Sequence, residues 1–462
     1  MTLIKNISGF RGTIGGENNI NLTPVDIVTS IAGFSKLIRE NNPNNNNLTV
    51  MTGRDGRKSG EMIQNIVNSV FSSMGINVID AGLSTTPTLC WGVLNNDSVA
   101  GLMITASHNP EEYNGLKFFN AEGEFLSRED VTKVIEYSEQ KTYDFAVNGS
   151  LGKISTYGNL IDDHIDAIIK LDILPLKEIK ELNLFVLADA INSGGAVALP
   201  KLLEKLNIRY KIINSEIEGV FNHTPEPLAE NLIDLSQEII KNNADFGIAV
   251  DPDVDRLVFF DEKGKILGEE YTQVFCSDFV LSTKKGNTVS TLSSSNALKD
   301  LTESYNSNYY FTPVGEMNVV KKMKEVNSVV GGEGGGGIIY PELHYGRDAL
   351  VGVALFLGLL VKKECKVSDL KGNYPEYFMK KLKVSLKDDK IIEKVFKDIT
   401  DTYSNLSPNT DDGVRIDFDK GWVHMRKSNT EPIVRIFSES NTQSHADELA
   451  LKIQKEIVSL SD

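Results

Sequence analysis

The sequence predicts an α/β protein made of three similar α/β domains with mixed sheets and a smaller C-terminal α+β domain. Up to Asn373, short apolar runs that end in Gly, Asp or Ser alternate with amphipathic stretches. This alternation is typical of strand–helix units. Beyond Asn373 the pattern becomes mixed and ends in a helix. The length of 462 residues accommodates three or four domains of ordinary size.

The predicted elements follow one another in chain order. The predicted strands cover residues 48–52, 100–105, 184–189, 246–251 and 327–332. The predicted helices cover residues 24–40, 61–74, 160–170, 196–206, 228–242, 349–363 and 445–460. The longest apolar run, 349–361, is shorter than the roughly 20 residues of a membrane span, so we expect a buried helix there and no membrane partner. The stretch 41–47, NNPNNNN, is a polar solvated loop.

Three breaks in the pattern predict the domain boundaries. Polar or glycine-bearing breaks lie at 149–153 and 363–373, and a third boundary falls close to the segment DPDVDR. The predicted domains are therefore 1–150, 151–256, 257–368 and 369–462. No strict sequence repeat relates them.

Charge and cysteine content exclude several classes of function. The net charge of −16 argues against binding to nucleic acid or anionic membranes, because like charges repel. A small phosphorylated substrate would therefore need a local cluster of cationic side chains. Cys90, Cys276 and Cys365 form no metal or redox spacing, which suits a reducing compartment. The segment MTLIKNISGF lacks the apolar core of a signal peptide, so we expect a cytoplasmic protein.

A serine, Ser107, follows the predicted strand 100–105 in the stretch ITASHNPEEYNGLKFF. His108 is its neighbour, and Lys117 comes ten residues later. Adjacent residues on a turn rarely face each other, and no G-x-S-x-G motif surrounds the serine. A protease-like pair of Ser107 and His108 is therefore not indicated.

Three aspartates, Asp251, Asp253 and Asp255, follow the predicted strand 246–251 at alternate positions. Carboxylates this close repel one another unless they share a cation, and oxygen-only ligands favour Mg²⁺ or Ca²⁺. A calcium loop is excluded because Arg256 stands where that loop needs glycine. An acidic surface turn is the plain alternative to a magnesium site.

Two further stretches offer ligand-binding groups. Glu333 is surrounded by six glycines, whose backbone N–H groups are free to bind a ligand unless the segment is merely a flexible loop. A lone carboxylate there suits sugar hydroxyls rather than phosphate. The segment HMRKSNTEPIVR offers many donors to an anion, from Arg426, Lys427, Ser428, Asn429, Thr430 and Arg435.

Other polar groups give weaker signals. Arg11 lies between glycines, and the segment 54–58, RDGRK, follows a strand; each could bind an anion or form an ordinary turn. We expect Arg347 and Asp348 to form a structural pair that caps the next helix. The histidines other than His108 are expected to be structural or surface groups.

Taken in order, these stretches resemble the α-D-phosphohexomutases over essentially the whole chain. TASHNP resembles the family's phosphoserine loop, DPDVDR its magnesium loop, GGEGGGG its sugar loop and RKSNTEP its phosphate loop. Within the superfamily the sequence looks most like the bacterial phosphoglucosamine mutases. The resemblance implies four domains around a central cleft, with one loop contributed by each domain.

The resemblance also implies roles for the residues. Ser107 would carry a phosphoryl group at the end of its strand, where α/β sheets place ligands. One Mg²⁺ per chain would be held by Ser107, Asp251, Asp253 and Asp255. The candidates for proton transfer are His108 and Lys117, since a lysine near other cations has a lowered pKa. The reacting phosphate, the sugar and the distal phosphate would be bound by Arg11, Arg256, Glu333, Gly335, Arg426, Ser428, Asn429, Thr430 and Arg435.

The implied reaction interconverts glucosamine 6-phosphate and glucosamine 1-phosphate. The phosphoserine donates to O1, the resulting 1,6-bisphosphate turns around in the cleft, and its 6-phosphate returns to the serine. Glucose or glucosamine 1,6-bisphosphate would act as activator or intermediate. The product would feed synthesis of UDP-N-acetylglucosamine and cell-wall precursors. The expected partners are small-molecule sugar phosphates only, and the protein would be a monomer or homodimer.

Two departures from the family pattern bear on the substrate. Many relatives read GEQSGH or GEMSGH in the sugar loop, whereas here Gly335 replaces the serine and Gly337 the histidine. His344, seven residues later, is a candidate substitute for that histidine. Asn429 stands where phosphoglucosamine mutases commonly have glycine and phosphomannomutase/phosphoglucomutase enzymes have asparagine. Phosphomannomutase/phosphoglucomutase is thus the main alternative, and a Mg²⁺-dependent sugar phosphatase or a non-catalytic sugar-phosphate binder are others.

Overall fold

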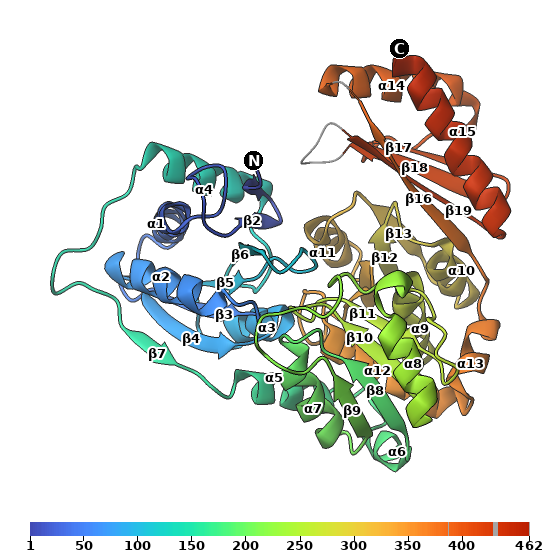
Figure 1. The fold of residues 1–462 in the computed structure, drawn as a ribbon, viewed down its shortest axis with the longest axis horizontal. Coiled ribbons are helices and arrows are strands. Elements are labelled where there is room, and N and C mark those ends of the chain that lie inside the picture. The colour runs from blue at the N-terminus through green and yellow to red at the C-terminus, as the bar shows by residue number, and fades with distance from the viewer. Residues whose placement is uncertain (387, 428–432, 462) are drawn as a thin grey trace.

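The chain folds into four sheets that follow one another along the sequence (Figure 1). The structure is a computed structural model that describes residues 1–386, 388–427 and 433–461. The first three sheets are mixed and the fourth is antiparallel, which confirms the predicted fold class.

The first sheet has seven strands in the order β1-β2-β6-β5-β3-β4-β7. Its strands are β1 (Ile4–Asn6), β2 (Gly9–Thr13), β3 (Thr49–Arg54), β4 (Asn77–Leu83), β5 (Ala100–Ile104), β6 (Tyr113–Phe119) and β7 (Ile154–Thr156). The helices of this part are α1 (Pro24–Asn41), α2 (Gly60–Ser73), α3 (Thr86–Asn95) and α4 (Arg128–Gln140). Helix α1 begins at a capping box formed by Thr23 and Asp26, with proline as its first residue.

The second and third sheets have four strands each, in the orders β11-β10-β8-β9 and β13-β12-β14-β15. The second contains β8 (Phe185–Asp189), β9 (Arg209–Ile213), β10 (Phe246–Val250) and β11 (Leu257–Phe260). The third contains β12 (Thr288–Thr291), β13 (Tyr309–Thr312), β14 (Val330–Glu333) and β15 (Gly337–Ile339). Their helices are α5 (Leu160–Ile169), α6 (Leu176–Glu181), α7 (Gly195–Lys205), α8 (Ile233–Asn242), α9 (Glu269–Thr283), α10 (Asn296–Ser304), α11 (Glu316–Glu325), α12 (Ala349–Lys363) and α13 (Val367–Leu370).

The C-terminal domain is an antiparallel sheet in the order β16-β19-β18-β17. It contains β16 (Phe378–Ser385), β17 (Val414–Phe418), β18 (Gly421–Lys427), β19 (Ile433–Ser440), α14 (Asp389–Thr402) and α15 (Gln443–Ser461). Figure 1 shows this domain at one end of the molecule. Both helices contribute to an apolar core that this domain shares with no other.

One strand arrangement occurs three times in the molecule. The strands β3–β6, β8–β11 and β12–β15, which we call units 1, 2 and 3, each place the third strand beside the first and add the fourth antiparallel to the third. The loop between the third and fourth strands is therefore equivalent in the three units. These loops are 105–112, 251–256 and 334–336. The three units repeat the order of their strands but not their residues, so the sequence itself shows no repeat.

Units 2 and 3 are joined by one continuous apolar core. Helix α12 lies at its centre and is buried along nearly its whole length, because its residues are apolar on every side. Phe356 of α12 stacks on Phe259 of β11 with ring centroids 3.8 Å apart. Among the described helices, none combines the length and apolar character needed to cross a bilayer.

Several predicted boundaries are wrong by a few residues. Strand β11 belongs to the second sheet, so the predicted boundary after Arg256 cuts a hairpin. Strand β7 pairs with β4, so the break near residue 150 precedes the last strand of the first sheet. The predicted helix 228–242 is a short 3₁₀ turn, Ala229–Asn231, followed by α8.

Candidate active site

The loop between β5 and β6 carries Ser107 at the carboxyl end of β5. The backbone of Ser107 adopts a φ of 47°, and its N–H donates to Thr105 Oγ1 at 2.9 Å. Its hydroxyl donates to a residue of another unit, Asp251 of unit 2, with a distance of 2.7 Å to Oδ2. The two residues are 144 positions apart in the sequence, so tertiary folding alone brings them together.

Arg57 holds the serine loop in shape. The sequence left open whether 54–58 binds an anion or forms a turn; the structure buries Arg57, with 1% exposed. Its Nε pairs with Asp55 Oδ2 at 3.1 Å, and that oxygen also accepts from Thr105 Oγ1 at 2.7 Å. Its guanidinium donates to four carbonyls at 2.6 to 2.9 Å, those of Ser107, Asn109 and Pro110 in the loop and that of Tyr113 at the start of β6.

The equivalent loop of unit 2 gathers the three aspartates. Oxygens of Asp251, Asp253 and Asp255 lie within 4.8 Å of one another, and all three residues are buried. The backbone turns at Val254, whose φ of 63° is strained for a β-branched residue. The N–H groups of Asp255 and Arg256 both donate to Asp251 Oδ1 at 3.0 Å. The local fold therefore supports a cluster of negative charge.

This cluster has the donor set of a hard divalent cation. Asp253 Oδ1 and Asp255 Oδ1 are buried without a hydrogen-bond partner. Burial, together with the charges of Asp255 and Asp253, raises the pKa of Asp251 well above its ordinary value. A cation would remove both the repulsion and the unsatisfied oxygens. The residues present thus fit Mg²⁺, which prefers oxygen ligands.

Lys117 of β6 spans two of these carboxylates. Its Nζ donates to Asp253 Oδ2 at 2.6 Å and to Asp255 Oδ2 at 2.9 Å. Burial lowers the pKa of Lys117, but the two aspartates outweigh burial and raise the pKa above its ordinary value. The expected lowering of this pKa by nearby cations is therefore wrong. Thr86, at the start of α3, also donates to Asp253 Oδ2, a contact that sequence reasoning missed.

Three further groups surround the serine. The charge of Arg256 and burial lower the pKa of His108 well below its ordinary value, and Arg11 adds to this effect. His108 Nδ1 and Arg256 Nε are buried without a hydrogen-bond partner. Arg11 Nη1 donates to Asn109 Oδ1 at 3.2 Å, and Arg256 Nη1 pairs with Glu226 Oε1 at 3.1 Å. Two guanidinium groups and the imidazole therefore line the same cavity as Ser107.

The equivalent loop of unit 3 presents Glu333 beside Arg347. Glu333 Oε1 accepts from the Gly315 N–H at 3.0 Å, and Oε2 accepts from Arg347 Nη1 at 2.9 Å. Arg347 also donates to Asp255 Oδ2 at 2.8 Å and to Glu316 Oε2 at 2.9 Å. One guanidinium thus connects three carboxylates from two loops and the first turn of α11. Neither Glu316 nor this role of Arg347 was identified from the sequence.

Gly337 makes room for this arginine. A Cβ built on Gly337 would lie 2.3 Å from Arg347 Cδ, well inside contact distance. The stem of Arg347 therefore fills the space beside β15 that a side chain at position 337 would need. At Gly335 the nearest atom to such a Cβ is Arg256 Nη1 at 3.8 Å, so this position at the loop tip is open.

His344 does not replace the missing histidine of the sugar loop. It is 3% exposed and its Nε2 lies 3.3 Å from Asp348 Oδ2, outside the active-site cavity. His164 Nε2 lies 3.1 Å from the same oxygen, and His164 Nδ1 is 3.0 Å from Thr88 Oγ1 of α3. Asp348 caps α12 through Oδ1, as expected. This buried group ties α3 and α5 to α12.

The C-terminal domain contributes cations from two neighbouring strands. Arg426 of β18 and Arg435 of β19 stand opposite each other in the sheet register. Arg426 Nε lies 3.2 Å from Asp412 Oδ2, which also accepts from the Val314 N–H of unit 3 at 2.9 Å. Of the predicted phosphate-binding residues, Ser428, Asn429 and Thr430 lie outside the described residues.

A cavity of about 410 Å³ joins all these elements. Its lining includes Ser107 and other residues of the first domain, Arg256 of unit 2, the residues 314–318, Glu333 and Arg347 of the third domain, and three residues of the C-terminal domain. Seven of the described lining residues have positively charged side chains, namely Arg11, Lys117, Arg256, Arg347, Arg426, Lys427 and Arg435. A chain with a net charge of −16 has thus concentrated positive charge where an anion would bind.

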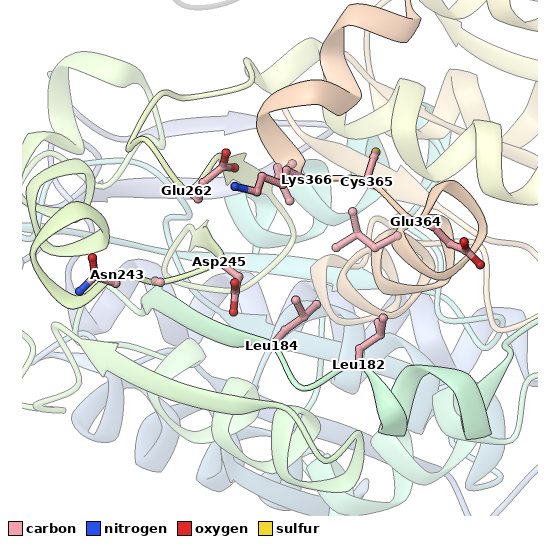
Figure 2. A pocket seen from close by; sticks show the side chains of 11 residues that line it. Leu182, Leu184, Asn243, Asp245, Glu262, Glu364, Cys365 and Lys366 are labelled. Carbon is pink, nitrogen blue, oxygen red and sulfur yellow. The ribbon is translucent and has the colours of Figure 1, made fainter.

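A larger cavity, of about 520 Å³, lies elsewhere (Figure 2). It is lined by Leu182, Leu184, the residues 243–245 and the end of α12. It contains none of the serine, aspartate or arginine groups described above. Size therefore does not identify the site, whereas the convergence of charged groups does.

Comparison with known families gives matches along most of the chain. The family descriptions phosphoglucomutase/phosphomannomutase α/β/α domains I, II and III match residues 3–144, 162–264 and 268–377. The C-terminal domain of the same family matches residues 379–456. The four matches follow the order of the four sheets.

Individual proteins give the same result. A phosphoglucomutase/phosphomannomutase of Thermococcus kodakarensis is 34% identical over 96% of this chain and 98% of its own. A phosphoglucosamine/phosphogalactosamine mutase of Sulfurisphaera tokodaii is 32% identical over 97% of each chain. The crystal structure of a phosphoglucomutase/phosphomannomutase family protein from Burkholderia thailandensis superposes with a TM-score of 0.83 at 21% identity, over 98% of this chain and 95% of the other.

Proposed function

The chain belongs to the phosphoglucomutase/phosphomannomutase family of α-D-phosphohexomutases, and from this premise we propose that it interconverts glucosamine 6-phosphate and glucosamine 1-phosphate. The observation that carries the proposal is the contact of Ser107 Oγ with Asp251 Oδ2 at 2.7 Å, inside a cavity lined by seven cations. A hydroxyl that could act as nucleophile, carboxylates that could hold a cation and cationic side chains that could bind phosphate come together there. The relative from Sulfurisphaera tokodaii supports the choice of an amino sugar.

In the proposed reaction, Ser107 Oγ carries the phosphoryl group that is transferred. The O1 hydroxyl of the sugar attacks phosphorus, the new O1–P bond forms as the P–Oγ bond breaks, and the hydroxyl proton leaves. His108 and Lys117 line the cavity with the serine and are our candidates for moving this proton. The lowered pKa of His108 suits the group that accepts it, and the raised pKa of Lys117 suits a group that donates a proton in the reverse step. Arg11 and Arg256 would hold the phosphoryl oxygens.

The three aspartates and the oxygen on Ser107 would hold one Mg²⁺. When bound, the ion neutralises charge on the phosphoryl group. Lys117, bonded to Asp253 and Asp255, fixes these carboxylates from the side of unit 1. Thr86 fixes Asp253 in the same way.

The 1,6-bisphosphate would then turn around, so the distal phosphate must be gripped in both orientations. Arg426 and Arg435 are the described residues proposed for this grip, and Ser428, Asn429 and Thr430 complete it. Glu333 would bind sugar hydroxyls beside Gly335. The 1-phosphate product would feed synthesis of UDP-N-acetylglucosamine and cell-wall precursors.

Phosphoglucomutase/phosphomannomutase activity is the second candidate, because the relative from Thermococcus kodakarensis carries that name. A panel of glucosamine, glucose and mannose 6-phosphates, each with an activating 1,6-bisphosphate, separates the two. We expect the highest kcat/KM for glucosamine 6-phosphate. A clear preference for glucose or mannose would replace the proposed substrate.

The phosphoserine is tested by intact mass and by turnover of Ser107→Ala. A fraction of the purified protein should be one phosphoryl group heavier, and the variant should lose both this mass and the activity. The matched control is Ser69→Ala on α2, whose exposed hydroxyl bonds only its own helix. An active Ser107→Ala protein would refute the mechanism.

A further inference from the structure

We propose that Glu316 binds the 2-ammonium group of the amino sugar and thereby makes the enzyme prefer glucosamine 6-phosphate to glucose 6-phosphate. The inference rests on the proposed function and assigns its sugar selectivity to one side chain. Three observations lead to it, namely the charges that line the cavity, the partners of Glu316, and the packing that holds Arg347 in place.

The described lining of the cavity contains two carboxylates, Glu316 and Glu333, against seven cations. Both carboxylates come from unit 3. Units 1 and 2 contribute Arg11, Lys117 and Arg256 to the lining, together with Ser107, and the C-terminal domain contributes Arg426, Lys427 and Arg435. In the proposed reaction the two phosphates of the substrate face these cations. The carboxylates of unit 3 are then left to face the sugar ring between them.

The two carboxylates differ in the number of short hydrogen bonds that their oxygens already accept. Both oxygens of Glu333 accept hydrogen bonds, at 3.0 Å from the Gly315 N–H and at 2.9 Å from Arg347. Glu316 Oε2 accepts from Arg347 Nε at 2.9 Å, but Oε1 has only a long contact of 3.4 Å with the Arg347 N–H. Of the two carboxylates, Glu316 is therefore the one with an oxygen that lacks a short hydrogen-bond donor.

The local charge count also leaves a place for a cation. Arg347 pairs with Asp255, Glu316 and Glu333, and Asp255 has Lys117 as a second partner. Glu316 and Glu333 thus share one guanidinium, and Lys117 is itself shared by Asp253 and Asp255, so carboxylates outnumber cations here when Glu316 is ionised. Phosphate cannot occupy such a place, whereas an ammonium group can. A neutral 2-hydroxyl would gain much less from it than a charged donor would.

The surroundings strengthen Glu316 as a partner for a cation. Burial, together with the charges of Asp255 and Glu333, raises the pKa of Glu316 to about 7 against the pull of Arg347. The side chain is 11% exposed, so a bound ammonium would be largely shielded from water. Arg347 is also held in place, because its guanidinium is bonded to Asp255 and Glu333 as well as to Glu316. It therefore cannot move away from Glu316 without breaking these bonds.

The test compares two substrates that differ only at C2. We measure kcat/KM for glucosamine 6-phosphate and for glucose 6-phosphate in the wild type, in Glu316→Gln, and in two control variants. Glu316→Gln should lower the preference for the amino sugar ten- to a hundredfold, which corresponds to about 1.4 to 2.8 kcal/mol at about 1.4 kcal/mol per factor of ten. Glu333→Gln should lower both rates together. Glu325→Gln, at the exposed end of the same helix, should leave both unchanged.

Each outcome of this test either supports or overturns the role of Glu316. A preference that survives in Glu316→Gln overturns the inference and leaves the proposed function standing. Equal losses on both sugars also overturn it, because Glu316 would then bind a hydroxyl or merely position Arg347. A wild type that does not turn over glucosamine 6-phosphate refutes the proposed function, and the inference with it. Thermal unfolding of each variant shows whether a loss reflects misfolding instead; if Glu316→Gln is unfolded, Glu316→Asp takes its place, and it should retain part of the preference.

Discussion

Replacing Gly337 by alanine should disable the site although residue 337 makes no contact with substrate in the proposed mechanism. The added Cβ would lie 2.3 Å from Arg347 Cδ, whereas ordinary carbon contacts begin at about 3.5 Å. The arginine stem must therefore retreat by about 1 Å. Its bonds to Asp255, Glu333 and Glu316, all between 2.8 and 2.9 Å, cannot survive such a shift together.

The magnitude follows from these three bonds. Each charge-assisted bond contributes about 1.5 to 3 kcal/mol, and a misplacement of about 1 Å in a catalytic site costs about a hundredfold in rate. We therefore expect Gly337→Ala to lower kcat/KM about a hundredfold and to lower the temperature of thermal unfolding. Gly335→Ala, whose Cβ meets nothing closer than 3.8 Å, should leave that temperature unchanged.

A double-mutant cycle shows whether the clash is the cause. In an Arg347→Ala background there is no stem to displace, so Gly337→Ala should have almost no further effect on kcat/KM. Full additivity of the two losses would refute the reasoning, as would a Gly337→Ala protein with wild-type activity and stability.

Two further predictions concern the serine loop and Glu316. Arg57→Leu leaves Asp55 and four carbonyls without their partner, so it should lower the free energy of unfolding by about 3 to 5 kcal/mol and abolish phosphorylation of Ser107. The control is Lys58→Ala, at the exposed neighbouring position. An Arg57→Leu protein that is stable and normally phosphorylated would contradict the role of Arg57. The pKa of Glu316 rises from 4.5 to about 7 on folding, so the folded state binds the proton more tightly and the contribution of Glu316 to stability should fall as pH rises through this range. Glutamine does not titrate, so the stability of Glu316→Gln relative to the wild type should rise by up to about 3 kcal/mol between pH 4.5 and 7 in denaturant unfolding. A difference that stays constant over this range would contradict the prediction.

The parts of the site that follow buried strands could be predicted from the sequence. Asp251 and its two companions are recognisable because three carboxylates in five residues, directly after a buried strand, repel one another unless they share a cation. Ser107 is recognisable because it follows an apolar run directly. The helix 349–363 was placed at its observed bounds, because an unbroken apolar run at helical length has one stable environment, the core.

The residues that sequence reasoning missed act through contacts that no local pattern records. Glu316 is an ordinary acid at the start of an amphipathic helix, and only the cavity gives it a role. Arg347 looked like a capping partner of Asp348, yet its guanidinium connects two loops that are 78 residues apart, at Asp255 and Glu333. Arg57 looked like part of a basic turn, because burial of a charge cannot be read from neighbours in sequence.

The distribution of cores decides which part of the cavity can move in the proposed reaction. Units 2 and 3 share one apolar core, and Ser107 and Lys117 bind unit 1 to the aspartates of unit 2. The C-terminal domain has its own core and meets unit 3 through polar contacts, among them Arg415 Nη1 with the Leu292 carbonyl at 2.6 Å. Breaking polar contacts that water can replace costs far less than exposing a core. In the proposed reaction, the space in which the bisphosphate turns around would therefore come from a movement of the C-terminal domain. The serine, the aspartates and Glu333 would keep their places.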